Sequence, residues 1–247
     1  MTAHVDVADD GPIRLVRMNR PDKKNALTLP MYAAMAEAIE QAKGIRCILI
    51  AGSPGAFSAG NDLEDFLKAG QSGEGLGTEI LRFLYALVRS ELPIVAAVDG
   101  LAVGIGTTML LHCDHVVASD TSRFSTPFVQ LGLVPEAASS LVVPRLMGHR
   151  NAFSLLIMGR AMDAKTAREA GLVNAVVSAS EVETHAMQAA REIAALPREA
   201  VAASRRLMRG SPEELVSRID EEAALFKLRL KSPEARAAFE SFLQRKR

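Results

Sequence analysis

Residues 96–114 read AAVDGLAVGIGTTMLLHCD and combine three features in a short space. An apolar run is followed by glycines at Gly100, Gly104 and Gly106, and then by an apolar segment that predicts a buried helix. A helix that begins among glycines exposes backbone N–H groups without intrahelical partners, and its dipole adds partial positive charge there. Such a helix start is suited to bind an oxygen that carries or develops negative charge.

A second glycine loop, FSAGNDL at residues 57–63, also follows an apolar run, at residues 47–51. Two units of strand, glycine loop and helix can aim two backbone N–H groups at one oxygen. The sequence therefore leads to the hypothesis that the two glycine loops together bind a developing oxyanion. The same glycines also have a purely structural use, because they permit tight turns and close packing of backbones.

The bulk composition excludes several classes of protein. The chain has 247 residues, 49% hydrophobic and 23% charged, as expected for one large globular domain with an appendage. Lys plus Arg and Asp plus Glu number 29 each, so no global field attracts nucleic acid or an anionic membrane. No apolar run approaches the ~20 residues of a membrane span. Cys47 and Cys113 lie in apolar segments, so we expect buried thiols, with no disulfide frame and no metal site.

The two ends of the sequence predict the compartment. The N-terminal stretch MTAHVDVADDG has acidic residues and lacks the apolar core of a signal peptide. The C-terminal QRKR differs from the peroxisomal address SKL. We therefore expect a cytoplasmic protein.

Periodicity along the chain predicts an alternating α/β body followed by a helical tail from residue 182 to the end. A hairpin is predicted at residues 4–18, and the glycine-rich residues 69–78 predict a mobile loop with a pocket lid as its candidate role. Further predicted strands are 46–51, 94–98, 115–118, 123–125 and 175–177, and predicted helices are 29–43, 80–88, 141–147, 151–158 and 164–170. The tail has an apolar stripe that either the body or a neighbouring subunit must cover. Its members are Ile219, Ala223, Phe226, Leu230, Phe239, Phe242 and Leu243.

Four segments of the sequence resemble the crotonase, or enoyl-CoA hydratase/isomerase, superfamily. They are RPDKKNAL at 20–27, AFSAGNDL at 56–63, DGLAVGIGTTMLLHCDHVVAS at 99–119 and STPFVQLGLVPEAASSLVVPRLMG at 125–148. The resemblance implies an α/β crotonase (ClpP-like) spiral of ββα units in residues 1–195 and a C-terminal helical oligomerisation region in residues 196–247. It also implies an acyl-CoA thioester substrate, a homotrimer or dimer of trimers, and no cofactor, because coenzyme A enters as part of the substrate.

The resemblance also implies which residues form the site. By position, the backbone N–H groups of Ala59 and Ile105 match the family's two oxyanion donors, in agreement with the glycine-loop hypothesis. Losing one such donor costs about 3–4 kcal/mol of transition-state stabilisation. The matching substrate- and CoA-binding residues are Lys23, Lys24, Ala26, Leu27, Gly60, Asn61, Asp62, Gly104 and Phe128. Lysines beside phosphates make electrostatic sense, and Asp62 is also expected to cap the helix after its loop.

One carboxylate is expected to carry the acid–base chemistry. Hydratases of this family have two glutamates, and the matching positions here hold Thr108 and Phe128, neither of which can act as a general base. Glu136, in GLVPEAASS, matches the single catalytic glutamate of peroxisomal-type Δ3,Δ2-enoyl-CoA isomerases. Shifting a double bond from C3 to C2 needs one base that takes a proton from C2 and returns it to C4. An apolar surround should raise the Glu136 pKa toward neutrality, and Pro135-Glu136 also fits a plain helix start.

The sequence leaves two other functions open and excludes two more. A hydratase is possible in principle if Glu136 shares the work with a distant carboxylate such as Glu64 or Asp65. A non-catalytic acyl-CoA-binding crotonase-like protein is the alternative from another class. A dinucleotide-binding fingerprint is rejected because Met109 stands where its third glycine belongs, and a serine hydrolase because GxSxG is absent.

The glycine turn at residues 100–106 is called the central turn below. Three polar residues that follow it are expected to be structural. His112 and His115 lie in apolar runs and predict core or edge positions. Asp114 ends the predicted central helix, where a local structural role is expected.

Overall fold

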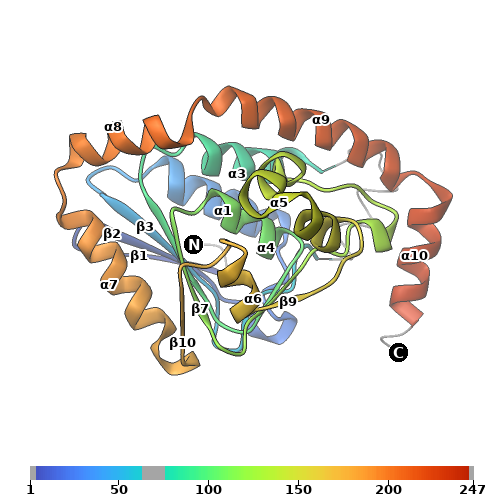
Figure 1. The fold of residues 1–247 in the computed structure, drawn as a ribbon, viewed down its shortest axis with the longest axis horizontal. Helices are drawn as coiled ribbons and strands as arrows, with labels where there is room; N and C mark the ends of the chain where they lie inside the picture. Colours follow the sequence, from blue (N-terminus) through green and yellow to red (C-terminus); the bar gives the residue numbers. More distant parts are fainter. Residues whose placement is uncertain (1–3, 63–75, 245–247) are drawn as a thin grey trace.

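The computed structural model describes residues 4–62 and 76–244. Within these residues the strands form a six-stranded and a four-stranded sheet (Figure 1). The first sheet has the order β1 (Val5–Asp10), β2 (Ile13–Met18), β3 (Cys47–Ala51), β5 (Ile94–Val98), β7 (His115–Ser119) and β10 (Ala175–Val177). The second has the order β4 (Ala56–Ser58), β6 (Leu101–Val103), β8 (Arg123–Ser125) and β9 (Met162–Asp163). The predicted hairpin is confirmed as the antiparallel pair β1–β2.

The chain repeats one step three times. Strands β3, β5 and β7 lie side by side and parallel in the first sheet. Each is followed directly by a short strand of the second sheet, β4, β6 or β8, and these are also parallel neighbours. This repeat is the spiral of ββα units that the resemblance implies. Strands β3 and β5 are buried throughout, which explains their continuous apolar sequences, since parallel strands are covered on both faces.

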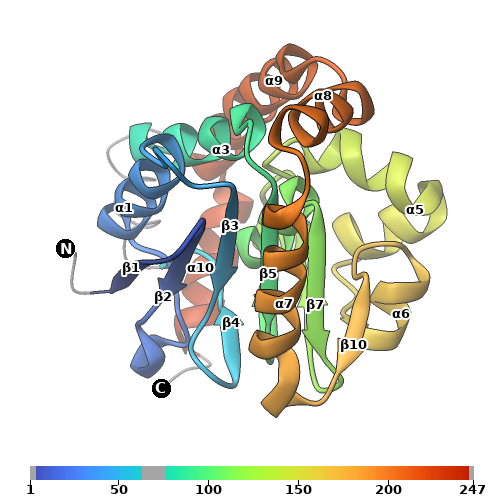
Figure 2. The same ribbon diagram turned by 90° about the vertical axis from the view of Figure 1, so that its left-hand side faces the viewer.

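Helices cover both faces of the first sheet. Helix α7 (Val182–Ala195) lies across β3, β5 and β7 on one face, through alanines spaced four residues apart (Figure 2). On the other side, α1 (Leu29–Glu40) packs against α3 (Thr78–Arg89). The remaining helical elements are η1 (Pro21–Lys23), α4 (Ile105–Thr108), η2 (Met109–His112), η3 (Val129–Leu131), α5 (Ser139–Leu156), α6 (Ala164–Glu169), η4 (Ala179–Glu181), α8 (Arg198–Arg209), α9 (Pro212–Leu230) and α10 (Pro233–Gln244). None of the described helices is long and apolar enough to cross a bilayer.

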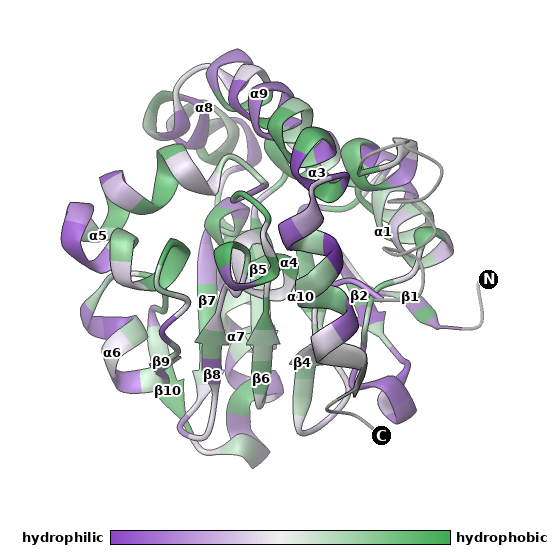
Figure 3. Cartoon of the chain, turned by 90° about the vertical axis from the view of Figure 1, so that its right-hand side faces the viewer, coloured by the Kyte–Doolittle hydropathy of each residue, from purple (hydrophilic) through white to green (hydrophobic). Residues whose placement is uncertain are grey.

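The C-terminal helices wrap around the body. Helix α9 packs against α3, and α10 packs against η3, in front of the second sheet in Figure 3. The body of the same chain covers Ile219, Phe226, Leu230 and Phe239, which are all buried. The first of the two alternatives for this stripe is therefore confirmed at these four positions, while the side chains of Phe242 and Leu243 lie outside the described residues.

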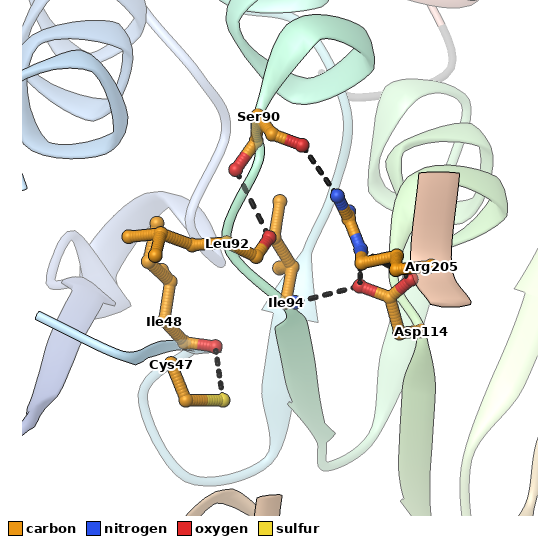
Figure 4. Close-up of polar contacts among 7 residues, drawn as sticks. All are labelled: Cys47, Ile48, Ser90, Leu92, Ile94, Asp114 and Arg205. Carbon is orange, nitrogen blue, oxygen red and sulfur yellow. Dashed lines mark hydrogen bonds and ion pairs between the residues drawn. The ribbon is translucent and has the colours of Figure 1, made fainter. Parts of the chain in front are cut away.

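Asp114 anchors helix α8 to the body. Its carboxylate accepts the N–H of Ile94 at 2.8 Å and forms an ion pair with Arg205 of α8 at 2.8 Å (Figure 4). Arg205 also donates to the carbonyl of Ser90, at the end of α3. The structural role expected for Asp114 is confirmed. Nearby Cys47 is a buried free thiol, as expected, and burial raises its pKa to about 12.

Several predicted elements differ from the structure. The helix predicted after the central turn is only the short α4, followed by the 3₁₀ turn η2. The two helices predicted within residues 141–158 are merged in α5, although Gly148 interrupts it with a non-helical φ of 76°. The sequence does not predict β4 and β6, because both lie in segments whose glycines indicate loops, nor β9, which has only two residues. Most of the predicted loop 69–78 lies outside the described residues.

Candidate active site

The two glycine loops lie against each other. A Cβ atom added at Gly106 would stand 2.8 Å from the carbonyl oxygen of Ser58, and one at Gly60 would stand 2.8 Å from that of Val103. Side chains cannot fit at such distances, so glycine is required for this approach. Ala59 therefore lies between two points of contact with the central turn. The two loops are therefore close enough for the hypothesis made from the sequence, while their binding of an oxyanion stays a prediction.

The two predicted amide donors differ in their present partners. Ile105 begins α4, where a helix provides no acceptor, and its N–H has none among the described residues. The N–H of Ala59 instead donates to the carbonyl of Lys24 at 2.8 Å. The backbone of Lys24 and Asn25 lies in the left-handed region, with φ of 51° and 53°. One predicted donor is thus free, and the other is engaged within the chain.

The predicted coenzyme A loop packs beside the first glycine loop. Leu27 donates its N–H to Gly60 at 2.8 Å, and its carbonyl accepts the N–H of Asp62 at 2.9 Å. The carboxylate of Asp62 forms an ion pair with Arg20 at 2.7 Å, and both side chains are mostly buried. Lys23, Lys24 and the half-buried Ala26 follow on this loop, and both lysines are exposed. Arg20 is a residue that the sequence prediction missed, and it fixes this arrangement.

Glu136 is buried beside the central turn. Only 1% of the residue is exposed, and its carboxylate accepts the hydroxyl hydrogen of Thr108. Helical side chains point back toward the start of the helix. The Thr108 hydroxyl oxygen therefore also lies 3.3 Å from the carbonyl oxygen of Gly104. That peptide unit carries the free N–H of Ile105. Burial raises the Glu136 pKa to about 8, as expected, while the Thr108 hydrogen bond lowers it and the charge of Glu222 raises it.

Glu136 stands on a strained turn and not on the helix start predicted from its sequence. Ala137 and Ala138 have φ of 58° and 55°, and α5 begins only at Ser139. The left-handed region costs a residue with a Cβ atom about 1–2 kcal/mol. Tertiary contacts hold the turn. His112 lies with Nε2 2.8 Å from the Ala137 carbonyl, and Glu222 accepts the Ala138 N–H at 2.6 Å.

The histidine of this turn is neutral. His112 is 1% exposed, and burial lowers its pKa to about 4. The neutral ring has one N–H, so Nε2 donates to the carbonyl of Ala137. His115 is half-buried in β7. The core and edge positions expected for these two residues are confirmed, although the support that His112 gives to the Glu136 turn was not predicted.

A cleft of about 960 Å³ opens between α1 and α3. Leu27 and Tyr32 form its buried side together with Asn61, whereas Arg82, Arg89 and Lys227 are exposed at its rim. The Tyr32 hydroxyl donates to the side chain of Asn61. Burial, and to a lesser extent the negative charge of Glu136, raise the Tyr32 pKa well above its usual value. Asn61 and Asp62 of the first glycine loop line this cleft, whereas Glu136, Thr108 and Ile105 do not.

Phe128 is buried near Gly104 of the central turn. It is 5% exposed, and a Cβ atom at Gly104 would lie 3.9 Å from its ring. Glu136 and Glu222 are the two buried carboxyl groups of the described residues, while Glu64 and Asp65 lie outside them. Within the same residues, no group of three His, Cys, Asp or Glu side chains could hold a metal ion.

Comparison with known proteins gives the same family by sequence and by structure. The model of the family described as enoyl-CoA hydratase/isomerase matches residues 9–247. Enoyl-CoA delta isomerase 2 of Rattus norvegicus is 35% identical over 247 residues, which cover 97% of this chain and 63% of the rat protein. Peroxisomal enoyl-CoA delta isomerase 3 of Mus musculus is 33% identical, over 97% of this chain and 77% of its own. The structure of Pseudomonas aeruginosa OdaA superposes with a TM-score of 0.93 at 42% identity, over 98% of this chain and 99% of that one. The chain thus spans less than two thirds of the rat relative.

Proposed function

This chain belongs to the enoyl-CoA hydratase/isomerase family, and on that premise we propose that it is an enoyl-CoA isomerase that shifts the double bond from C3 to C2. The observation that carries the proposal is the single buried carboxyl group beside the central turn. Glu136 contacts Thr108, and no second carboxylate occupies the positions of Thr108 and Phe128. Isomerisation needs one proton acceptor that later donates, and one carboxyl group is enough for both steps.

The proposed reaction begins with the thioester carbonyl oxygen bound at the Ile105 N–H. Ala59 becomes the second donor when its N–H exchanges the Lys24 carbonyl for this oxygen. The Glu136 carboxylate then takes a proton from C2, the C2–H electrons form the C1=C2 π bond of a dienolate, and the π electrons of the carbonyl move onto its oxygen as negative charge. Protonated Glu136 returns the proton to C4, which leaves the double bond between C2 and C3. No cofactor is required beyond the coenzyme A of the substrate.

The electrostatics of Glu136 suit both steps. A pKa of about 8 lies close to neutrality, so the group can accept a proton and also release it. The Thr108 hydroxyl donates to the carboxylate form. When Glu136 carries the proton, the same hydroxyl can donate to the Gly104 carbonyl, 3.3 Å away, and accept from the acid.

The test is Glu136→Gln, which keeps the shape of the side chain and removes its basicity. We expect turnover of a 3-enoyl-CoA to fall by about 10³-fold or more, since proton transfer is lost, while affinity for the CoA ester stays within a few-fold. Steady-state assays and a direct binding measurement check both parts. Glu169→Gln, on the exposed surface of α6, is the control and should behave as wild type.

The outcomes separate the alternatives. Retained turnover in Glu136→Gln would remove this residue from the mechanism. Faster hydration of a 2-enoyl-CoA than isomerisation of a 3-enoyl-CoA by the wild type would instead favour a hydratase. Normal CoA-ester binding without any proton exchange at the α-carbon would identify a non-catalytic binder.

We also propose that the C-terminal helical region assembles the protein into a homotrimer or a dimer of trimers. Large apolar side chains on the outer face of this region support the proposal. Leu207 and Met208 on α8 are 84% and 87% exposed, and Leu228 on α9 is 67% exposed. Contact with a second copy of the chain would remove these side chains from water.

A further inference from the structure

Glu222 is the second buried carboxyl group of the described residues, and it comes from the C-terminal helix α9. It is 4% exposed and lies 84 residues along the chain from its partner Ala138. Its carboxylate accepts the N–H of Ala138 at 2.6 Å, the N–H of Ser140 at 3.0 Å and the Ser140 hydroxyl. Three donors from one short segment therefore converge on it, directly after Glu136.

These donors belong to the start of helix α5. The first N–H groups of a helix lack partners within it, and Ala138 at the cap position has no side chain that could supply one. Glu222, which lies on the distant helix α9, acts as the capping acceptor for α5. Its negative charge also complements the dipole at the start of α5. Without this acceptor the strained Ala137 and Ala138 have less to hold them in the left-handed region.

Two separate elements form hydrogen bonds with the Ala137–Ala138 turn. His112 of η2 holds the carbonyl of Ala137, and Glu222 of α9 holds the following N–H groups. The backbone of Glu136 is joined directly to this fixed segment, so the position of its carboxyl group depends on both contacts. His112 lies in η2, directly after α4, whereas Glu222 connects the Ala137–Ala138 turn to the C-terminal region.

We propose that Glu222 is a positioning residue for the acid–base group: by holding the left-handed Ala137–Ala138 turn, it places the Glu136 carboxyl group beside Thr108. This inference rests on the proposed function of Glu136. It gives the C-terminal region a direct part in the site, in addition to any part in assembly.

The charges around the pair predict a second effect. Glu222 raises the pKa of Glu136 through its negative charge. Burial raises the pKa of Glu222 itself, while the hydrogen bonds from Ser140 and Ala138 and the charge of Arg218 lower it. Burial and the charge of Glu136 raise the pKa of Tyr32 on α1 well above its usual value, and burial holds His112 neutral, so neither carries charge near pH 7. Removing the charge of Glu222 should therefore lower the pH at which Glu136 ionises.

The experiment measures kcat and KM for a 3-enoyl-CoA as a function of pH, in Glu222→Gln and in Glu221→Gln. A glutamine at 222 offers one acceptor oxygen and turns an NH₂ group toward remaining donors, so the turn should loosen. We expect the high-pH plateau of kcat to fall by about 10- to 100-fold with KM within about twofold, since misplacing a reacting group chiefly affects the chemical step. The midpoint of the pH profile should move to lower pH. Glu221, an exposed neighbour paired with Arg218 at 3.3 Å, is the matched control and should change neither quantity.

A folded Glu222→Gln variant with the wild-type plateau and midpoint would overturn the inference. If that variant does not fold, Ser140→Ala decides, because it removes one of the three donors and leaves both N–H groups. Its kcat should fall several-fold with KM unchanged, and a wild-type kcat would overturn the inference. Glu136→Gln is measured in parallel. If it stays active, the proposed function and this inference fail together, whereas an inactive Glu136→Gln beside a wild-type Glu222→Gln defeats only the inference.

Discussion

Thr108 stands where hydratases of this family carry a glutamate, and its hydroxyl contacts the one carboxyl group of the proposed site. A hydroxyl group has both a donor and acceptor lone pairs, so it can satisfy Glu136 as carboxylate and as acid. A second carboxylate at this position would repel Glu136 and would raise its pKa further. The residue choice at 108 therefore favours a chemistry with one shuttling proton.

Thr108→Val should move the pH profile upward. Valine keeps the shape of threonine but cannot donate, and the lost hydrogen bond is one that lowers the Glu136 pKa. The active form is the carboxylate, so kcat/KM of the wild type should rise with pH through about 8, and that of the variant through a higher value. A midpoint one unit higher lowers kcat/KM at pH 7 by about tenfold. Thr108→Ser should restore the wild-type profile, and an unchanged or lower midpoint in Thr108→Val would contradict the role given to the hydroxyl.

At the scale of elements, the site depends on how closely α4 approaches the first glycine loop. Gly106 lies within α4 and has helical backbone angles, so its conformation does not require glycine. Only the contact with Ser58 does, since a Cβ atom would stand 2.8 Å from its carbonyl oxygen and 3.0 Å from its Cβ. The position of the α4 start relative to Ala59 is thus set by one missing methyl group.

Gly106→Ala should separate the two loops and reduce catalysis. Because the donor geometry changes, we expect kcat to fall by about tenfold or more, and overpacking should lower the free energy of unfolding by about 1–3 kcal/mol. Gly11→Ala is the control, since Gly11 has φ of 57° in the hairpin turn with open space around it. It should lose about 1 kcal/mol through strain and keep wild-type activity. Kinetics and denaturant unfolding measure both quantities, and a fully active Gly106→Ala would show that the close approach is not needed.

At the scale of the whole molecule, the C-terminal helices have an inner and an outer face. The inner face supplies Glu222 to the turn of Glu136, and Arg205 forms an ion pair that joins α8 to Asp114, directly before β7. The outer face leaves Leu207 and Met208 in water. One region thus joins the proposed site to the proposed assembly.

Charging the outer face of α8 should dissociate the proposed oligomer. In Leu207→Glu/Met208→Glu, burial of two carboxylates would oppose subunit contact, while both positions are exposed within one chain and should tolerate the change. We expect sedimentation to give three or six copies for the wild type and a single folded chain for the variant. Lys165→Glu, at an exposed position on α6, is the control. A monomeric wild type, or a variant of unchanged size, would place the assembly surface elsewhere or remove it.

Local sequence patterns were enough for the family resemblance, the alternating α/β order and the position of the two glycine loops, while the catalytic role of Glu136 stays a prediction. Each of these depends on residue type and short spacing, which determine strands, turns and helix starts. Three features depend on tertiary contacts. Ala137 and Ala138 are left-handed, the Lys24 carbonyl accepts the Ala59 N–H, and Glu222 supports the Ala137–Ala138 turn. Glu-Ala-Ala favours a helix by itself, and only contacts from His112 and from a helix 84 residues away make the strained alternative stable.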